Sequence, residues 1–171
     1  YSMERQATKI NRTPKWLSKE QLAEIERSGH NRDYLPDIAL PKSLRFESDL
    51  SRAIKRLSAQ DLVVIATPMS GLSEAIDKVL IEAEHPLNII WLCKGLEPST
   101  ALLPHQVVAR QANLHSHGIK HLYGALSGPS FASEVGAGMP CALTIASIST
   151  DLCTVAQTAF HHGNMRIYSS D

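Results

Sequence analysis

Hydrophobic residues along this chain follow two spacings that alternate with each other. Short segments of strand-like character, several of them continuous apolar runs typical of buried central strands, occur at Ser43–Phe46, Leu62–Ala66, Leu87–Cys93, His121–Leu126, Ala142–Ala146 and Met165–Tyr168. Between them, apolar residues recur at helical spacing, as in Leu72, Ala75, Ile76, Val79 and Leu80, and in Leu152, Val155, Ala156, Ala159 and Phe160. The spacing predicts that both stripes are core. The alternation predicts an α/β fold, with a mostly parallel sheet and helices on both faces.

Three of the predicted strands are followed by loops that carry candidate binding chemistry. These loops are Thr67 to Ser70, Lys94-Gly95 and Ser127 to Ser130. Carboxyl ends of parallel strands lie at one edge of a sheet, and ligands bind in the crevice there. We therefore expect Lys94 to lie near the Ser127 to Ser130 turn, although a Lys-Gly pair is also common in plain surface turns.

The turn from Leu126 to Val135 has the composition of an anion-binding connection between a strand and a helix. Gly128 allows close backbone approach to a ligand, and Pro129 is suited to open the helix. Unpaired N–H groups of the first helical turn, together with Ser130, then face a phosphate or carboxylate. The alternative is an ordinary strand-to-helix connection with an N-cap and no ligand.

Composition limits the classes of function. With 171 residues, 43% hydrophobic and 20% charged, the chain suffices for one core of ordinary domain size. Lys plus Arg and Asp plus Glu balance at 17 each, so no overall field favours nucleic acid, and we expect no membrane span. The histidines at 115, 117, 121, 161 and 162 lack carboxylates or thiols at ligand spacing, so we expect no metal site. The three cysteines are expected to be free thiols in a reducing cytoplasm.

Several ordered motifs resemble one family. The stretch from Leu126 to Ser147, LSGPSFASEVGAGMPCALTIAS, is similar to the most recognisable motif of the bacterial NAD(P)-dependent glycerol-3-phosphate dehydrogenases. Asn31 to Asp37, Asp61 to Pro68 and Trp91 to Glu97 resemble the same family in the same order. Because several motifs agree in order, the resemblance is more specific than a lone glycine fingerprint.

The resemblance implies a partial Rossmann-like domain. The family opens with a strand and a G-x-G-x-x-G turn, which this sequence does not contain, and Gly136-x-Gly138 lacks the third glycine. We expect residues 21–171 to form the NAD(P)-binding domain and residues 1–20 to be an N-terminal segment of uncertain origin. The family's helical domain, with its general acid/base lysine, is expected beyond Asp171, so the isolated chain is expected to be inactive.

The function implied by the resemblance is interconversion of sn-glycerol 3-phosphate and dihydroxyacetone phosphate with NAD or NADP, feeding glycerophospholipid synthesis in a bacterial cytoplasm. A homodimer of the complete enzyme is compatible with it. Glu4 suits the ribose hydroxyl of NAD and Arg5 the phosphate of NADP, so the cofactor preference stays open. The site residues implied are Lys94 for substrate and cofactor, Gly128 and Ser130 for substrate, and Ala132, Pro68, Met3 and Glu4 for cofactor.

Two alternatives stay open. One is a related two-domain reductase of another oxo acid, such as ketopantoate. The other is a non-catalytic α/β module kept for binding.

Overall fold

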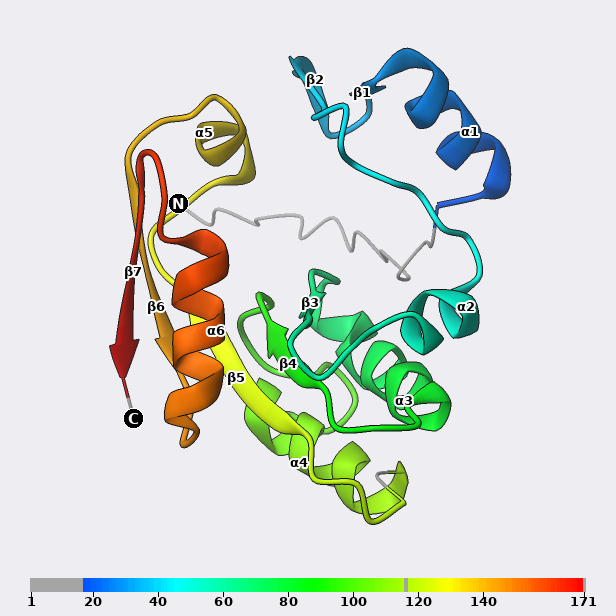
Figure 1. The fold of residues 1–171 in the computed structure, drawn as a ribbon, viewed down its shortest axis with the longest axis vertical. Helices are drawn as coiled ribbons and strands as arrows, with labels where there is room; N and C mark the ends of the chain where they lie inside the picture. Colours follow the sequence, from blue (N-terminus) through cyan, green and yellow to red (C-terminus); the bar gives the residue numbers. More distant parts are fainter. Residues whose placement is uncertain (1–16, 116, 171) are drawn as a thin grey trace, which may run out of the picture.

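The computed structural model describes residues 17–115 and 117–170, and its main sheet has five strands (Figure 1). The strands lie in the order of the chain: β3 (Leu62–Ile65), β4 (Asn88–Trp91), β5 (Leu122–Ser127), β6 (Cys141–Ala146) and β7 (Met165–Ser170). The pairs β3–β4, β4–β5 and β6–β7 are parallel, and β5–β6 is antiparallel. The prediction of a mostly parallel sheet is confirmed.

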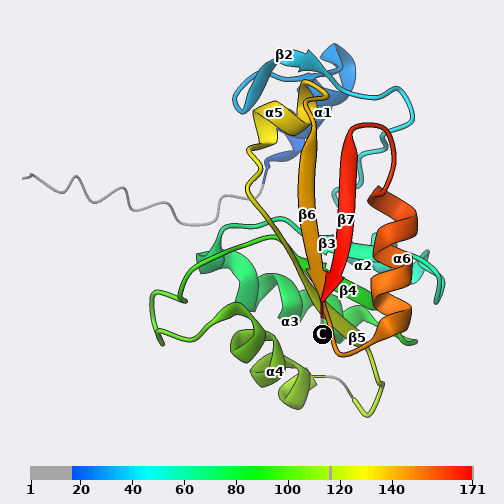
Figure 2. The same ribbon diagram turned by 90° about the vertical axis from the view of Figure 1, so that its left-hand side faces the viewer.

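Helices cover both faces of the sheet, as predicted (Figure 2). On one face, α3 (Leu72–Glu82) and α4 (Pro104–His115) share a core with Ile89 and Trp91 of β4. On the other face, α6 (Thr150–Phe160) packs against Ile90, which lies between those two residues on the same strand. Alternate residues of a strand point to opposite faces, so one apolar strand supplies both cores.

The two apolar stripes predicted from helical spacing differ in outcome. All five residues of the α3 stripe are buried, so that prediction is confirmed. In α6 the stripe is buried at Leu152 and Ala156, but Ala159 is exposed. The prediction is wrong at Ala159, which does not belong to the core, although Phe160 beside it packs against that core while half-buried.

The N-terminal part of the described chain forms a smaller unit. It contains α1 (Lys19–Ser28) and an antiparallel pair, β1 (His30–Asn31) and β2 (Leu35–Ala39), followed by α2 (Leu50–Lys55), which packs on α3. The Ser18 hydroxyl accepts a hydrogen bond from the Gln21 amide, and the Gln21 side chain accepts one from the Ser18 amide. This capping box starts α1 at Lys19.

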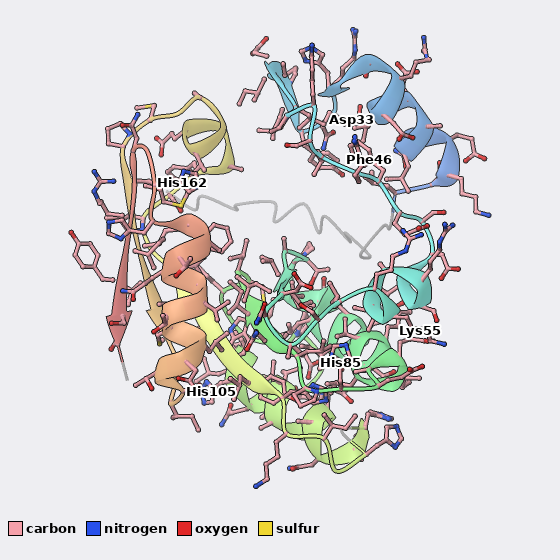
Figure 3. The ribbon with its side chains drawn as sticks, viewed as in Figure 1. Asp33, Phe46, Lys55, His85, His105 and His162 are labelled. Carbon is pink, nitrogen blue, oxygen red and sulfur yellow. The ribbon has the colours of Figure 1, made fainter. Side chains whose placement is uncertain are left out.

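The strand predicted at Ser43–Phe46 is wrong. Residues 43–46 belong to the irregular connection between β2 and α2, where Figure 3 shows the Phe46 side chain. A turn closed by a hydrogen bond from the Leu44 amide to the Pro41 carbonyl begins this connection, and Leu44 is exposed. Two apolar residues are too few to hold a strand against the sheet when the chain turns immediately before it.

All three cysteines are free thiols, as predicted, and Cys153 is buried. In the part of the chain that the structure describes, the helices are too short or too polar to cross a membrane.

Candidate functional site

Three loops meet at one edge of the sheet because β3, β4 and β5 run in the same direction. The expected proximity of Lys94 to the turn after β5 is confirmed by a direct contact. The Lys94 Nζ donates a hydrogen bond of 2.7 Å to the carbonyl oxygen of Gly128. Lys94 is exposed, so its ammonium group is available to a ligand at this edge.

The turn after β5 is tightly folded against the next strand. The Gly128 carbonyl oxygen also accepts a hydrogen bond of 3.0 Å from the Ser130 amide. A Cβ atom at Gly128 would lie 2.6 Å from the Ala142 carbonyl oxygen of β6 and 2.8 Å from Leu143 Cδ2. Glycine is therefore required here by the approach of β6, a reason that differs from the close ligand approach expected from the sequence.

The helix expected at Pro129 starts later. The next helix, α5, spans Ala132–Gly136, so the prediction that Pro129 opens it is wrong. Pro129 instead lies at a bend that the hydrogen bond from the Ser130 amide to the Gly128 carbonyl closes, and the Phe131 amide donates a 3.4 Å hydrogen bond to Glu134 Oε2. This carboxylate at the helix start disfavours an anion there. At this edge the Lys94 ammonium and the Ser130 hydroxyl are groups that can donate hydrogen bonds to an anion.

A cavity of about 520 Å³ gathers most of the predicted site residues. Lys94, Gly128, Ser130 and Ala132 all line it. Pro68 is not part of its lining and instead precedes a short 3-10 turn, Met69–Gly71, after β3. Met3 and Glu4 lie outside the described residues.

The floor of this cavity is apolar, and its residues are not among the site residues predicted from the sequence. It includes Val64, Leu92, Leu126 and Leu143 from four neighbouring strands or their ends. Val64 is 38% and Leu92 36% exposed, unusual for residues inside apolar strand runs. The available signal was period-two spacing, which places Leu92 on the same face as Ile90. Phe160, predicted as core, also lines this cavity.

A second cavity, of about 750 Å³, lies on the α4 side of the sheet. Lys94 borders it as well, together with Cys93, His105 and Tyr123. Burial raises the pKa of the Tyr123 hydroxyl to about 12 and raises the pKa of the Cys93 thiol. The raised pKa values keep the Tyr123 hydroxyl and the Cys93 thiol neutral at pH 7. Neither group therefore offsets the positive charge of Lys94, which borders both cavities.

Sequence comparisons place these features in a known context. Residues 5–153 match the family model described as the N-terminus of NAD-dependent glycerol-3-phosphate dehydrogenase. Over 151 residues the chain is 72% identical to a glycerol-3-phosphate dehydrogenase [NAD(P)+] of Polynucleobacter asymbioticus, covering 88% of this chain and 44% of the relative. It is 49% identical over 154 residues to the protein of that name in Ralstonia nicotianae, covering 88% of this chain and 44% of the relative.

Structural comparison agrees with the sequence matches. The crystal structure of a glycerol-3-phosphate dehydrogenase from Coxiella burnetii superposes with a TM-score of 0.76 at 26% identity, over 89% of this chain and 44% of that one. The Plasmodium falciparum glycerol-3-phosphate dehydrogenase has a TM-score of 0.74 at 20% identity, over 90% of this chain and 41% of that one, and shows the shared fold. The chain spans less than half the length of these relatives.

Proposed function

This chain belongs to the NAD-dependent glycerol-3-phosphate dehydrogenase family, and from that premise we propose that it forms part of an oxidoreductase. The reaction is the interconversion of sn-glycerol 3-phosphate and dihydroxyacetone phosphate with NAD or NADP. Names of relatives such as the Polynucleobacter asymbioticus protein support this assignment. The resemblance predicted from the motifs is confirmed at the level of the family.

The single observation that carries the proposal is the hydrogen bond from Lys94 to Gly128. It joins the Lys-Gly motif after β4 to the Ser-Gly-Pro-Ser motif after β5 in one cavity. An ammonium group has three N–H donors, of which Gly128 takes one. The remaining donors suit the oxygen atoms of a small phosphate ester.

Each proposed role follows from the chemistry of the side chain. The Lys94 ammonium binds substrate oxygen atoms and stabilises the negative charge that develops on the carbonyl oxygen as it is reduced. The Ser130 hydroxyl donates to the phosphate, and Gly128 holds the turn that presents it. The proton that completes the alcohol comes from a general acid, which the family resemblance implies is a lysine of the family's helical domain.

The cavity fits the nicotinamide end of a dinucleotide in chemical terms. Its floor of Val64, Leu92, Leu126 and Leu143 offers apolar contact to a flat ring and excludes water from the reacting atoms. Bound NAD(P)H supplies the hydride that reduces the carbonyl carbon of the substrate. Ala132 contributes to the cofactor side of the cavity, and Pro68 shapes the neighbouring end of β3.

The remaining parts of the proposal rest on the family resemblance alone. They are a role for Met3 and Glu4 at the adenosine ribose, catalysis in the bacterial cytoplasm in support of glycerophospholipid synthesis, and a homodimer as the complete enzyme. The expected division into residues 1–20 and a nucleotide-binding domain of residues 21–171 is proposed on the same basis.

A chimera tests the proposed reaction. In the Polynucleobacter asymbioticus relative, the stretch matched over 151 residues is replaced by the corresponding part of this chain. Oxidation of NADH and of NADPH is followed by absorbance with dihydroxyacetone phosphate and, separately, with ketopantoate. We expect turnover with the triose phosphate alone, and the faster nucleotide defines the cofactor preference.

The unmodified relative is the positive control, and circular dichroism establishes that the chimera is folded. Turnover with ketopantoate alone would favour the oxo-acid reductase. A folded chimera without turnover would favour the non-catalytic binding module.

A further inference from the structure

The loop that carries Lys94 is held at both of its ends. The Leu92 amide donates a 3.0 Å hydrogen bond to the Ile65 carbonyl oxygen and so continues the β3–β4 pairing. Gly95, which follows Lys94, has a φ of 94°, a backbone conformation that glycine adopts without strain. The next fixed point is Glu97, whose side chain is only 7% exposed. Lys94 therefore lies between two anchors that are five residues apart.

The Glu97 carboxylate is held by a two-point contact with Arg110 of α4. Arg110 Nη1 donates to Glu97 Oε2 and Nη2 to Oε1, both at 3.0 Å, and the Thr100 hydroxyl also donates to Oε2. These contacts, the Arg110 hydrogen bonds above all, lower the pKa of the Glu97 carboxyl. Two parallel hydrogen bonds of this kind fix the orientation of the Glu97 carboxylate relative to the Arg110 guanidinium as well as the distance between them.

Arg110 is in turn tied to a second helix. Its Nη2 donates a 3.2 Å hydrogen bond to the Ser73 hydroxyl of α3, which also accepts one from Gln111. Both helices pack against the sheet through fully buried residues, among them Leu72 and Val107. The Glu97 end of the Lys94 loop is thereby hydrogen-bonded to α4 and, through Arg110, to α3.

The backbone around Glu97 is closed into a compact turn. The Glu97 amide donates a 2.9 Å hydrogen bond to the Leu102 carbonyl, and the Ala101 amide donates a 2.8 Å bond to the Glu97 carbonyl. Glu97 is buried and Arg110 partly exposed, and an ion pair of this kind adds little net stability on average, because desolvation offsets the attraction. In some proteins such a pair also selects one arrangement of the groups around it.

We propose that the Glu97–Arg110 pair positions Lys94 for the substrate, so that the two residues act on catalysis through Lys94 without touching the reacting atoms. This inference rests on the proposed function. Loss of the pair leaves β4 in place and frees Gly95 and Leu96, which lets the Lys94 ammonium leave the Gly128 carbonyl. An error of about 1 Å in such a group lowers rates by up to about a hundredfold.

The kinetic test uses Glu97→Gln in the chimera described above. We expect kcat/KM for dihydroxyacetone phosphate to fall by about tenfold or more. In a Lys94→Ala background the same change should have no further effect, because residues that act through one group are not additive. Arg110→Lys, which keeps the charge but not the fork, is the second variant and should show the same pattern.

Glu84→Gln is the matched control. It removes the exposed ion pair of Glu84 with Lys55, whose atoms are 3.6 Å apart, and should leave kcat/KM unchanged. The proposal is overturned if Glu97→Gln and Arg110→Lys lower only the melting temperature, or if their effects add in full to that of Lys94→Ala.

A chemical readout separates this inference from the proposed reaction. Lysine acetylation by acetic anhydride is measured by mass spectrometry on the 171-residue chain, with the exposed Lys120 as internal reference. Glu97→Gln should raise the acetylation rate of Lys94 several-fold and leave that of Lys120 unchanged, whether or not the chimera turns over. An unchanged Lys94 rate in folded Glu97→Gln would overturn the positioning role by itself.

Discussion

Lys94 and Gly128 are 34 positions apart in the sequence, yet the Lys94 ammonium donates a 2.7 Å hydrogen bond to the Gly128 carbonyl oxygen. The contact follows from the parallel pairing of β4 with β5, which brings the ends of both strands to one edge. It joins the cation of one loop to the hydroxyl-bearing turn of the other. The proposed substrate site is built from this contact and from the apolar floor beside it.

Gly128→Ala should destabilise the fold. The added methyl group would lie 2.6 Å from the Ala142 carbonyl oxygen, a backbone atom of β6 that cannot move without disturbing the sheet. We expect a loss of about 1–3 kcal/mol in the free energy of unfolding, measured by urea denaturation of the chain with circular dichroism.

Gly136→Ala is the matched control for Gly128→Ala. Its methyl group would also lie 2.6 Å from a neighbour, but that neighbour is the Ile38 Cδ1 atom, the end of a flexible side chain. We expect the free energy of unfolding to change by less than about 0.5 kcal/mol. Equal losses for the two variants would contradict the close approach of β6 as the reason for glycine at position 128.

His121 should make stability fall on acidification. Its ring is buried, its Nδ1 accepts a 3.2 Å hydrogen bond from the Leu87 amide, and burial lowers its pKa in the folded state. In the unfolded chain the pKa of this histidine is about 6.5, so below that pH the unfolded chain binds a proton at His121 while the folded chain does not. Stability from this residue is therefore present above that pH and is lost as pH falls toward the folded pKa.

His121→Asn tests this pH dependence, because the amide oxygen of asparagine preserves an acceptor for Leu87 and does not titrate. Urea denaturation at a series of pH values from neutral to mildly acidic should show that the free energy of unfolding falls less steeply with acidification than in the parent chain.

His85→Asn should have the opposite effect, a steeper fall in the free energy of unfolding on acidification. The pKa of His85 is raised by hydrogen bonds to the Pro86 and Leu57 carbonyls, so the folded parent gains stability there as pH falls. Parallel pH profiles for the parent and His121→Asn would contradict the assignment.

Part of this architecture is readable from local sequence. The five apolar residues of the stripe from Leu72 to Leu80 are all buried, because α3 packs this face against the sheet. The predicted stripe from Leu152 to Phe160 lies within α6, which begins after Ser149, whose hydroxyl accepts a hydrogen bond from the Leu152 amide. Spacing and packing agree along the whole α3 stripe, and in α6 they agree at Leu152 and Ala156 but not at Ala159.

The rest depends on contacts between distant segments. The strand predicted at Ser43–Phe46 does not form, while β2 (Leu35–Ala39) does, despite its Pro36 and Asp37. Pairing with β1 and packing of Ile38 against Gly136 of α5 explain that strand, and neither contact is visible in local spacing. β6 pairs antiparallel with β5, because α5, with five residues, is too short to carry the chain back for a parallel crossover. The spacing of apolar residues does not reveal the direction of a strand.

The site shows the same division. The sequence predicts that Lys94 and Ser130 lie at one edge of the sheet, because both follow the carboxyl ends of parallel strands. It does not assign Leu35 or Phe160 to the same cavity, since these come from a hairpin and from the end of a helix that only the fold brings there. The Glu97–Arg110 contact is similarly invisible before α4 is placed against the loop after β4.

The measurement that tests the account most directly is the kinetics of Lys94→Ala in the chimera. Because Lys94 is exposed, its removal should leave the melting temperature of the chimera unchanged. With dihydroxyacetone phosphate as substrate, kcat/KM should fall by about a hundredfold or more, while Lys120→Ala at the opposite end of β5 has no effect. A Lys94→Ala chimera that keeps kcat/KM within about twofold of the parent would contradict the central claim.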